Sequence, residues 1–375
     1  MNLSFKYRLY PNKIQSEAID NNLRLLRNLY NSALEERISY YKKYKKSRSK
    51  YDQYNCLSEI RSSNPEYKNL YSQSLQGCLS QIDSAYNNFF RKIKNKSVAP
   101  GFPRFKNETR FRSIIFPQCN LKSGGVKLLD KKIIIHNIPG TIRIELHRPI
   151  LGKCKQVKIL KQSDKYYMIA VCTDILPNPL SKTNKTIAID LGISNFITTD
   201  DGTTFSHPKP YNKLKVKLSL KNSKLSKKKR GSNNSKRLRK TINKQYEKIS
   251  NIREDFQHKL SKKIISENDI IIIEKLNIKS MLEAKGFEVD KNNITDASWG
   301  SFATKLKYKA ERAGRLVIEV NPRNTSKTCS KCGKVKEKLS LKDRIYHCEA
   351  CGFTLDRDHN AALNIKRLGT SPTIT

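Results

Sequence analysis

Four cysteines in the last quarter of the chain are spaced as ligands of a single metal ion. They form two pairs, Cys329 with Cys332 and Cys348 with Cys351, and fifteen residues separate the pairs. Zinc favours four thiolates at the corners of a tetrahedron, and each C-x2-C turn supplies two of them. Unrelated buried cysteines, the alternative, have no reason to adopt this spacing. We therefore expect one structural Zn²⁺ ion in a zinc ribbon over residues 321–353.

Three acidic residues stand where a carboxylate is costly unless a cation is close. Asp190 ends an apolar run, Glu274 closes a run of isoleucines, and Asp358 lies seven residues after Cys351. A carboxylate at the end of a buried strand loses hydration that a metal ion can replace. Two Mg²⁺ ions about 3.5 to 4 Å apart, held by carboxylate oxygens, can activate water for in-line attack on a phosphodiester. We expect two catalytic Mg²⁺ ions, with Mn²⁺ as a substitute, at Asp190, Glu274 and Asp358.

Each acid also has a simpler interpretation. Asp190 and Glu274 could merely end their strands. Asp358 could cap the helix that we expect to begin at Asn360, because aspartate is a common N-cap residue. Asp356 competes with Asp358 for the role of third ligand, and the spacing alone does not separate the two.

Hydrophobic patterns predict how the second half of the chain positions these acids. The predicted elements are, in order, strands 187–190, 196–199 and 203–205, a long helix toward Ile265, strand 269–274, a helix around 302–310, strand 316–320 and a helix at 360–368. This order is the one that an RNase H-like (RuvC) α/β nuclease domain requires, over residues 181–320 and 354–369, with the ribbon inserted. In that fold the first and fourth strands are neighbours. Asp190 and Glu274 would therefore meet, and Asp358 would lean over the same point.

Helical and strand patterns alternate in the first half of the chain. Apolar residues with a period near 3.6 predict two long helices, at 14–38 and 75–93, in a helical domain over residues 12–95. Seven short strands, at 3–10 and between residues 113 and 173, favour a compact β-barrel over residues 1–11 and 96–180. The helical domain is therefore an insertion after the first strand. Residues 370–375 are expected to form a tail. The predicted barrel strands are 3–10, 113–116, 126–129, 132–136, 141–146, 156–160 and 166–173.

The charge of the chain indicates a nucleic-acid partner. Its 75 Lys and Arg residues outnumber 33 Asp and Glu residues, which gives a formal net charge of +42. A field this positive attracts polyanions over long distances. Residues 209–248 hold sixteen cations and one acid, Glu247, so we favour a nucleic-acid contact there over a solvated linker.

Three further features favour a cytoplasmic protein. No apolar run approaches the ~20 residues that span a bilayer, and the N-terminus lacks a signal-peptide core, so we expect no membrane partner. The five cysteines outside the two pairs are scattered, as reduced thiols of a cytosolic protein are. We expect a cytoplasmic, prokaryotic protein that acts at the nucleoid.

Several segments of the chain together form a recognisable set that covers nearly its whole length. They are residues 7–11, 101–106, 188–192, 273–276, 321–329, the second cysteine pair and 356–365. These segments resemble the TnpB (OrfB) family, which is related to the type V CRISPR nucleases. The resemblance implies an RNA-guided, metal-dependent DNA endonuclease of an insertion sequence, which cleaves target DNA beside a short flanking motif by a two-metal RuvC mechanism. It also implies that Asp190, Glu274 and Asp358 are the catalytic triad, since Asp358 aligns with the first residue of the family's Asp-x-Asn-Ala-Ala core.

The resemblance implies partners and roles for the other parts as well. The partners would be a guide RNA from the transposon end and target double-stranded DNA, with one protein per guide RNA, although the sequence leaves the oligomeric state open. The β-rich part would be a wedge domain, the helical insertion a recognition domain, and the ribbon and the loop at residues 281–300 a gate to the active site. Gln73 and Gln76 match the family segment that touches the flanking motif, unless they are only polar surface residues. The other predicted nucleic-acid contacts are Arg104, Lys106, Lys227, Lys228, Lys229 and Arg230.

Two other functions fit parts of the sequence. A nuclease-inactive RNA-guided DNA-binding regulator would share the fold, but this chain retains all three acids and all four cysteines. A DDE-type transposase also uses three acids, with the last one commonly close after the second. Here Glu274 lies 84 positions after Asp190, and Asp358 lies 84 positions after Glu274, which favours the endonuclease.

Overall fold

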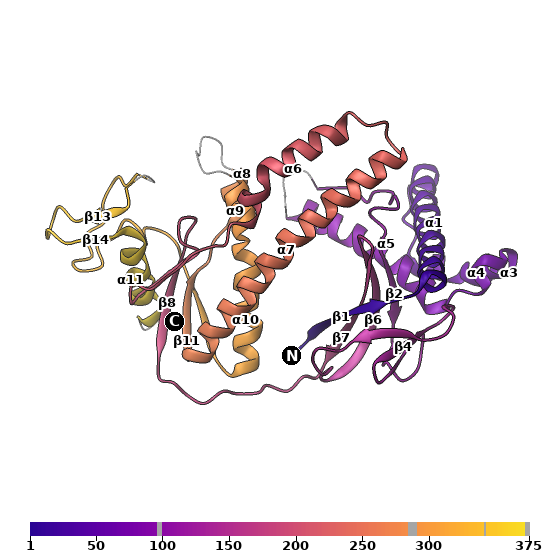
Figure 1. Cartoon of the computed structure of the whole chain (residues 1–375), viewed down its shortest axis with the longest axis horizontal. Helices are drawn as coiled ribbons and strands as arrows, with labels where there is room; N and C mark the ends of the chain where they lie inside the picture. Colours follow the sequence, from indigo (N-terminus) through magenta and orange to yellow (C-terminus); the bar gives the residue numbers. More distant parts are fainter. Residues whose placement is uncertain (96–99, 284–290, 341–342, 372–375) are drawn as a thin grey trace. The chain divides into compact units, whose positions relative to one another are not determined.

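The computed structural model describes residues 1–95, 100–283, 291–340 and 343–371. The chain divides into two units, Met1–Leu176 and Pro177–Thr375, each with a sheet of its own (Figure 1). Residues 96–99, where the predicted helical domain joins the predicted barrel, lie outside the described residues. None of the described helices is long and apolar enough to cross a membrane.

A seven-stranded antiparallel sheet forms the core of the first unit. Its strands lie in the order β2-β6-β7-β1-β5-β4-β3, so the first strand of the chain is at the centre. That strand, β1, pairs with β7 on one side and with β5 on the other. All seven predicted strands are confirmed: β1 (Leu3–Tyr10), β2 (Ser113–Pro117), β3 (Val126–Leu129), β4 (Lys132–Ile135), β5 (Ile142–Glu145), β6 (Lys153–Gln162) and β7 (Lys165–Thr173).

The two ends of this sheet meet through side chains. β2 and β3 occupy the ends, and no strand pairing joins them within the described residues. Gly125, directly before β3, lies so close to Phe116 of β2 that an added Cβ would be 2.1 Å from the ring. In place of the predicted closed barrel, the hydrogen bonds therefore form an open sheet, whose edges are in side-chain contact at this seam.

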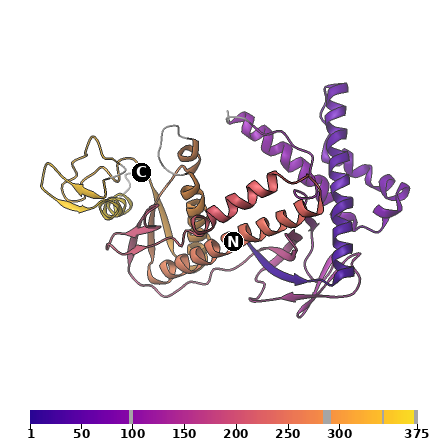
Figure 2. The same ribbon diagram turned by 45° about the horizontal axis from the view of Figure 1, so that its top comes forward.

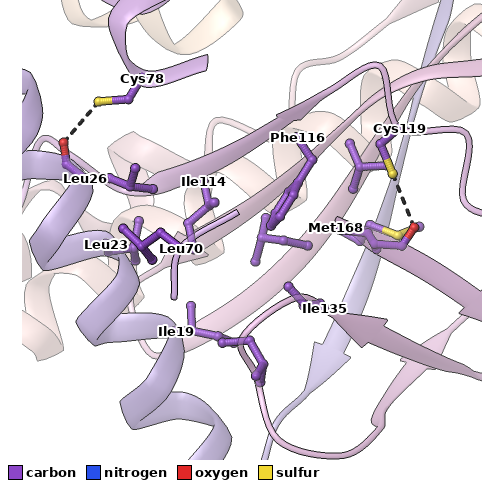
Figure 3. Packing of buried hydrophobic residues seen from close by; sticks show 14 of the residues in the cluster. Ile19, Leu23, Leu26, Leu70, Cys78, Ile114, Phe116, Cys119, Ile135 and Met168 are labelled. Atoms are coloured by element: carbon purple, nitrogen blue, oxygen red, sulfur yellow. Dashed lines mark hydrogen bonds between the residues drawn. The ribbon is translucent and has the colours of Figure 1, made fainter. Parts of the chain in front are cut away.

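Two long helices of the first unit pack against the sheet and against each other. α1 (Lys13–Tyr44) begins with a capping box, in which Asn12 and Gln15 each accept a hydrogen bond from the other's backbone N–H. α5 (Ser72–Lys94) packs on α1 and β2. Each fully buried Leu or Ile contributes about 1.5–3 kcal/mol, so this packing holds the helices on the sheet. Figure 3 shows core side chains of α1 and β2 directed at one another: Ile19, Leu23, Leu26, Ile114 and Phe116.

Three short helices between α1 and α5 were not predicted. They depend on local start signals, because none of them is long enough to show a periodic apolar face. Ser49 and Asp52 form a capping box at the first, and Pro65 occupies the first turn of the last, after the N-cap residue Asn64. The three are α2 (Lys50–Asn55), α3 (Leu57–Ser63) and α4 (Pro65–Lys68).

A five-stranded mixed sheet lies at the centre of the second unit. Its order is β10-β9-β8-β11-β12, in which β8 and β11 are parallel neighbours and β11 is also parallel to β12. The predicted adjacency of the first and fourth strands of this unit is thus confirmed. The strands are β8 (Thr186–Leu191), β9 (Ile197–Thr199), β10 (Thr204–Phe205), β11 (Ile270–Glu274) and β12 (Leu316–Val320).

Helices cover both faces of this second sheet. Side chains alternate between the faces of a strand, so Ile189 and Ile273 belong to one face, where they pack with α7 and α10. Ala188 and Ile272 belong to the other face, where they pack against Ile365 of α11. In Figure 1 the sheet accordingly lies between α10 and α11. These helices are α7 (Asn233–Glu267), α10 (Trp299–Ala313) and α11 (Arg357–Thr370).

The basic stretch at 209–248 forms most of a helical hairpin. Its second helix, α7, confirms the predicted long helix toward Ile265, and the helix before it was not predicted. α6 (Pro210–Ser226) and α7 run side by side (Figure 2). Leu218, Ile242 and Ile249 form a small core between the two helices. The connecting turn contains Gly231 with φ at +87°, a left-handed conformation that glycine adopts without strain.

Where it is described, the region predicted as a gating loop, residues 281–300, is mostly helical. α8 (Ile278–Glu283) and α9 (Lys291–Ala297) lie at its two ends, so the loop prediction is wrong there. Residues 284–290 of this region lie outside the described residues, as do residues 372–375 of the predicted tail. The tail prediction is also wrong at Thr370, which still belongs to α11.

Candidate active site and metal centres

Asp190 and Glu274 lie side by side at the carboxyl ends of two parallel strands. β8 and β11 stay in register up to the pair Ile189 and Ile273, so the next position sets Asp190 beside Glu274. Because side chains alternate, both acids leave the sheet on the face that α11 covers. Neighbouring strands are about 4.8 Å apart, so the strand pairing brings together two carboxylates that are distant in the sequence.

Asp358 reaches the same edge of the sheet from α11. It lies in the first turn of that helix, and its Oδ2 is close to Gly192, two residues after Asp190. An added Cβ at Gly192 would lie 3.8 Å from this oxygen and only 2.7 Å from the carbonyl oxygen of Asn195. Glycine therefore lets the chain turn tightly after β8, and the structure brings Asp190, Glu274 and Asp358 together.

Asp356 has a different role in the structure. It is the N-cap residue of α11, and its Oδ1 accepts hydrogen bonds from the backbone N–H groups of Asp358 and His359, both at 3.0 Å. The helix begins at Arg357 and not at Asn360, so the capping role falls to Asp356 and not to Asp358. Asp356 is exposed, whereas the side chain of Asp358 is only 18% exposed.

All three carboxylates have a raised pKa. Burial contributes most to the raised pKa of Asp190, followed by the charges of Glu274 and Asp358. Burial also raises the pKa of Glu274, and a hydrogen bond from Thr325 opposes this rise. For Asp358, burial is again the largest cause of the raised pKa. The positive charges of Arg344 and Arg357 lower the pKa of Asp358, and that of Arg357 also lowers the pKa of Asp190, but burial outweighs them.

This set of donors fits divalent cations that prefer oxygen ligands. Carboxylates suit Mg²⁺ and Mn²⁺, and a bound cation would offset both the burial and the repulsion between like charges. The ion pair of Asp358 with Arg344 is long, at 3.9 Å, and the arginine is 57% exposed, so it offsets little. Among the described residues, no acidic trio has its ligand atoms all within 4.8 Å of one another. The three carboxylates are thus not as close together as the four cysteine ligands are.

A threonine that the sequence analysis did not single out holds Glu274. Oγ1 of Thr325 donates a hydrogen bond to Oε1 of Glu274 at 2.5 Å, and both side chains are buried. The signal in the sequence that could have indicated Thr325 is its position in the segment 321–329, which carries part of the family resemblance. Because a threonine there has no ionisable or metal-binding group, the sequence alone did not connect Thr325 with the acids.

The four predicted zinc ligands come together in the ribbon. The strand β13 (Ile345–His347) lies within the predicted ribbon, residues 321–353, and pairs with β14 (Thr354–Asp356), which lies just beyond its predicted end. The Sγ atoms are 3.8 Å apart for Cys329 and Cys351 and 3.6 Å apart for Cys332 and Cys348. Tetrahedral Zn²⁺ with bonds of about 2.3 Å would set sulfur atoms about 3.8 Å apart. All four thiols are free of disulfides, so the cluster fits one zinc ion.

The ribbon is attached directly to α11. β14 leads into this helix without an intervening loop. Oδ1 of Asn360 accepts a hydrogen bond from the N–H of Ser330 at 2.9 Å, and its Nδ2 donates to the carbonyl oxygen of Thr328 at 2.8 Å. Ser330 and Thr328 flank Cys329. The amide of Asn360 thus ties the first cysteine pair to the helix that carries Asp358.

Most of the residues predicted to contact nucleic acid lie at the surface. The four cations at 227–230 are all exposed in the turn between α6 and α7. Gln76 and Arg104 are also exposed, and Gln73 is half-buried near the start of α5. These residues are free to meet a partner on the surface of their own unit.

Lys106, by contrast, is directed into the first unit. Its Nζ lies 4.0 Å from the centre of the Tyr30 ring and donates a hydrogen bond to Gln81. Its backbone N–H and carbonyl group both bond the side-chain amide of Asn31. Burial lowers the pKa of this lysine. The contacts of Lys106 are therefore those of a packing residue.

Family models match three parts of the chain. The OrfB_IS605 model, described as a probable transposase, matches residues 161–285, which include Asp190 and Glu274. The model of a Cas12f1-like TNB domain matches residues 299–365, which include Asp358 and the four cysteines. A helix-turn-helix model of the OrfB_IS605 group matches residues 1–46, where the structure has the strand β1 and the single helix α1.

Named relatives are similar along most of the chain. A putative RNA-guided DNA endonuclease of Streptomyces pristinaespiralis is 27% identical, over 98% of this chain and 89% of the relative. The putative RNA-guided DNA endonuclease InsQ of Escherichia coli (strain K12) is 28% identical, over 80% of this chain and 74% of that protein. The cryo-EM structure of a Cas12f1–sgRNA–target DNA complex matches 94% of this chain and 83% of that chain, with a TM-score of 0.56 and 16% identity. At this identity the structural likeness shows a shared multi-domain, mixed α/β fold.

Proposed function

We propose that this chain is an RNA-guided DNA endonuclease. The chain belongs to the TnpB (OrfB) family and is related to the type V CRISPR nucleases. The observation that carries this proposal is the meeting of Asp190, Glu274 and Asp358 at one edge of the second sheet. Hydrolysis of phosphodiester bonds in DNA would leave 5′-phosphate and 3′-hydroxyl ends.

We assign the second unit to an RNase H-like, RuvC-type nuclease domain with an inserted zinc ribbon. The strand order, with β8 beside β11 and helices on both faces, supports this assignment. We assign residues 1–11 and 96–180 to a wedge domain, whose described strands form the seven-stranded sheet of the first unit. The helices over residues 12–95 would form a recognition domain.

Asp190, Glu274 and Asp358 would hold two Mg²⁺ ions, which Mn²⁺ could replace. Bound ions of this kind supply a Lewis acid for the scissile phosphate and lower the pKa of a bound water. Glu274 is buried, and Asp190 and Asp358 are partly buried, so their attraction for a cation is stronger than it would be at the surface. Thr325 fixes one oxygen of Glu274, and the N-cap bonds of Asp356 fix the start of the helix that carries Asp358. The four cysteines would hold a structural Zn²⁺ ion.

The partners would be a guide RNA from the transposon end and target double-stranded DNA, with one protein per guide RNA. The net charge of +42 supports two polyanionic partners, because a large cationic surface can neutralise many phosphates. Gln73 and Gln76 are candidates for contact with the flanking motif, and the cations at 227–230 for contact with a phosphate backbone. We place this activity in a prokaryotic cytoplasm, at the nucleoid.

The test of this function is cleavage of a target plasmid by the purified protein with its guide RNA. We expect a break at the matching site when Mg²⁺ is present, and none when Mg²⁺ is omitted or the guide does not match. Cleavage that ignores the guide, or that proceeds without a divalent cation, would overturn the proposal.

Two other results would assign a different function. Guided binding without cleavage at any Mg²⁺ concentration would indicate a DNA-binding regulator. Joining of DNA strands to a new target by the purified protein would indicate a transposase.

A further inference from the structure

Thr325 connects the acid Glu274 with the segment that leads to the zinc ribbon. Its hydroxyl donates to Oε1 of Glu274, and the two side chains are 4% and 8% exposed. In the described parts of the chain, this is the side-chain hydrogen bond that Glu274 makes, and Oε2 has no protein partner. One oxygen of Glu274 is therefore fixed by the protein, and the other is free to bind a cation.

Two amides of α11 fix the backbone around Thr325. Nδ2 of Asn364 donates to the carbonyl oxygens of Thr325, at 2.9 Å, and of Thr328, at 2.7 Å. Asn360, one turn earlier, bonds the carbonyl group of Thr328 and the N–H of Ser330. Both amides are almost fully buried, at 0% and 1% exposed, so water cannot easily replace these bonds.

The segment held in this way also contains the first zinc ligand. Only three residues separate Thr325 from Cys329, whose N–H bonds the carbonyl group of Lys334 across the first knuckle. Residues 325–330 therefore touch Glu274 at one end and enter the cysteine cluster at the other. Only a few residues separate the knuckle from Thr325, so a change in the knuckle would displace the Thr325 hydroxyl.

We propose that Thr325 is a positioning residue for Glu274, and that the zinc knuckle keeps Thr325 in place through residues 325–329. This inference rests on the proposed function, because it takes Glu274 as a ligand of the Mg²⁺ site. Partners that orient a metal ligand typically contribute about 10–100-fold to metal affinity or activity. The hydroxyl of Thr325 occupies this role for Glu274.

The test compares three variants of the full-length protein. Thr325→Val keeps the shape of the side chain and removes the hydroxyl, whereas Thr325→Ser keeps the hydroxyl. Thr304→Val is the matched control, because Thr304 is exposed on α10 and its hydroxyl bonds the carbonyl group of Gly300 at 2.8 Å, outside the segment 325–330. Mn²⁺ binding is measured by electron paramagnetic resonance, with zinc content and melting temperature measured in parallel. We expect about 10-fold weaker Mn²⁺ binding in Thr325→Val, and binding like the wild type in the other two.

Guided cleavage at increasing Mg²⁺ gives a second readout. In Thr325→Val the half-saturating Mg²⁺ concentration should rise about 10-fold, while the rate at saturation largely recovers. If Thr325→Val does not fold, the pair Thr325→Ser and Thr325→Ala still differs by the hydroxyl alone. Equal Mn²⁺ binding by the variants with and without the hydroxyl would overturn the proposal, and so would a cleavage defect that Mg²⁺ does not relieve.

Failure of this inference can be told from failure of the proposed function. If the wild type cleaves a guided target but removal of the hydroxyl leaves Mn²⁺ binding unchanged, only the role of Thr325 is wrong. If the wild type neither binds Mn²⁺ nor cleaves, the proposed function itself fails.

Discussion

A carboxylate that is wholly or partly buried beside other carboxylates is harder to ionise, and three such groups meet at one edge of the second sheet. Asp190, Glu274 and Asp358 all have a raised pKa, with burial as the largest cause in each case. Without a cation, neutral pH therefore places these residues under electrostatic strain. This strain gives a consequence for stability that can be measured without any nucleic acid.

Asp190→Asn should raise the stability of the protein without added Mg²⁺ at neutral pH. The raised pKa means that the folded protein binds a proton at Asp190 more tightly than the unfolded chain does. The stability from this proton is present at low pH and is lost as the pH rises through the folded pKa. The melting temperature of the variant minus that of the wild type should be near zero around pH 4, where aspartate ordinarily titrates, and should grow toward pH 8. A difference that stays constant with pH would contradict this.

Asp356→Ala should lower stability and keep cleavage, whereas Asp358→Ala should keep the helix cap and lose cleavage. Asp356→Ala removes an N-cap and should cost about 0.5–2 kcal/mol of stability while guided cleavage persists. Asp358→Ala keeps the cap but should abolish cleavage. Urea unfolding and plasmid cleavage of both variants provide the measurement. Cleavage that survives only in Asp358→Ala would reverse the two roles.

At the scale of elements, the sequence predicted whatever has a strong local pattern. The isoleucine run 270–273 marks β11, and the order of strands indicates that Asp190 and Glu274 meet, as the register of β8 and β11 bears out. The four cysteines are similarly clear, because a C-x2-C turn brings its own ligands together.

Features that depend on backbone geometry or tertiary contact could not be predicted. Asp356 and Asp358 are both aspartates near a helix start, and only the backbone decides that α11 begins at Arg357. Thr325 is far from Glu274 in the sequence, so their hydrogen bond follows from the fold alone. The hairpin of α6 and α7 was not predicted because its apolar residues are few among many lysines, so the periodic pattern is weak. A turn at Gly231 also interrupts the pattern between the two helices.

Cys332→Ser should remove zinc from the ribbon and weaken the neighbouring metal site. Loss of the thiolate frees the segment 325–329, so Mn²⁺ binding should weaken in the same direction as in Thr325→Val. Zinc content and Mn²⁺ binding are measured on the same sample. Cys56→Ser, at a half-buried free cysteine of the first unit, is the control and should keep both. Zinc loss with unchanged Mn²⁺ binding would mean that the two sites are independent.

Replacement of the four cations at 227–230 by Gln should reduce the salt dependence of nucleic-acid binding. Each phosphate contact contributes about 0.7–0.9 to the slope of log K against log salt, so the slope should fall by up to about 3. Guide RNA binding by the protein and target DNA binding by the complex are both measured, and the change should occur in one of them.

Four exposed lysines of the first unit provide the control for this change, with the same loss of net charge at another place. An equal loss of slope for both sets would show that total charge, and not the turn between α6 and α7, governs binding. The control positions, all replaced by Gln, are Lys122, Lys127, Lys131 and Lys132.

At the scale of the whole molecule, a net charge of +42 is divided over two units, each with its own sheet. Few residues of the chain are candidates for catalysis, and many are Lys or Arg. This is expected when base pairing reads the target sequence and the protein binds nucleic-acid backbones. Recognition and cleavage should therefore be separable by mutation, because the acids lie at one sheet edge of the second unit alone.

Binding and cleavage of a guided plasmid by Asp190→Ala, measured beside the wild type, test the central claim most directly. Asp201→Ala is the matched control, because its carboxylate bonds Thr199 and Thr203 in the neighbouring turn. We expect Asp190→Ala with its guide RNA to bind the matching DNA as tightly as the wild type does and to leave it uncut in Mg²⁺, while Asp201→Ala cleaves. Cleavage by Asp190→Ala at the rate of the wild type would contradict the assignment of these acids to the active site.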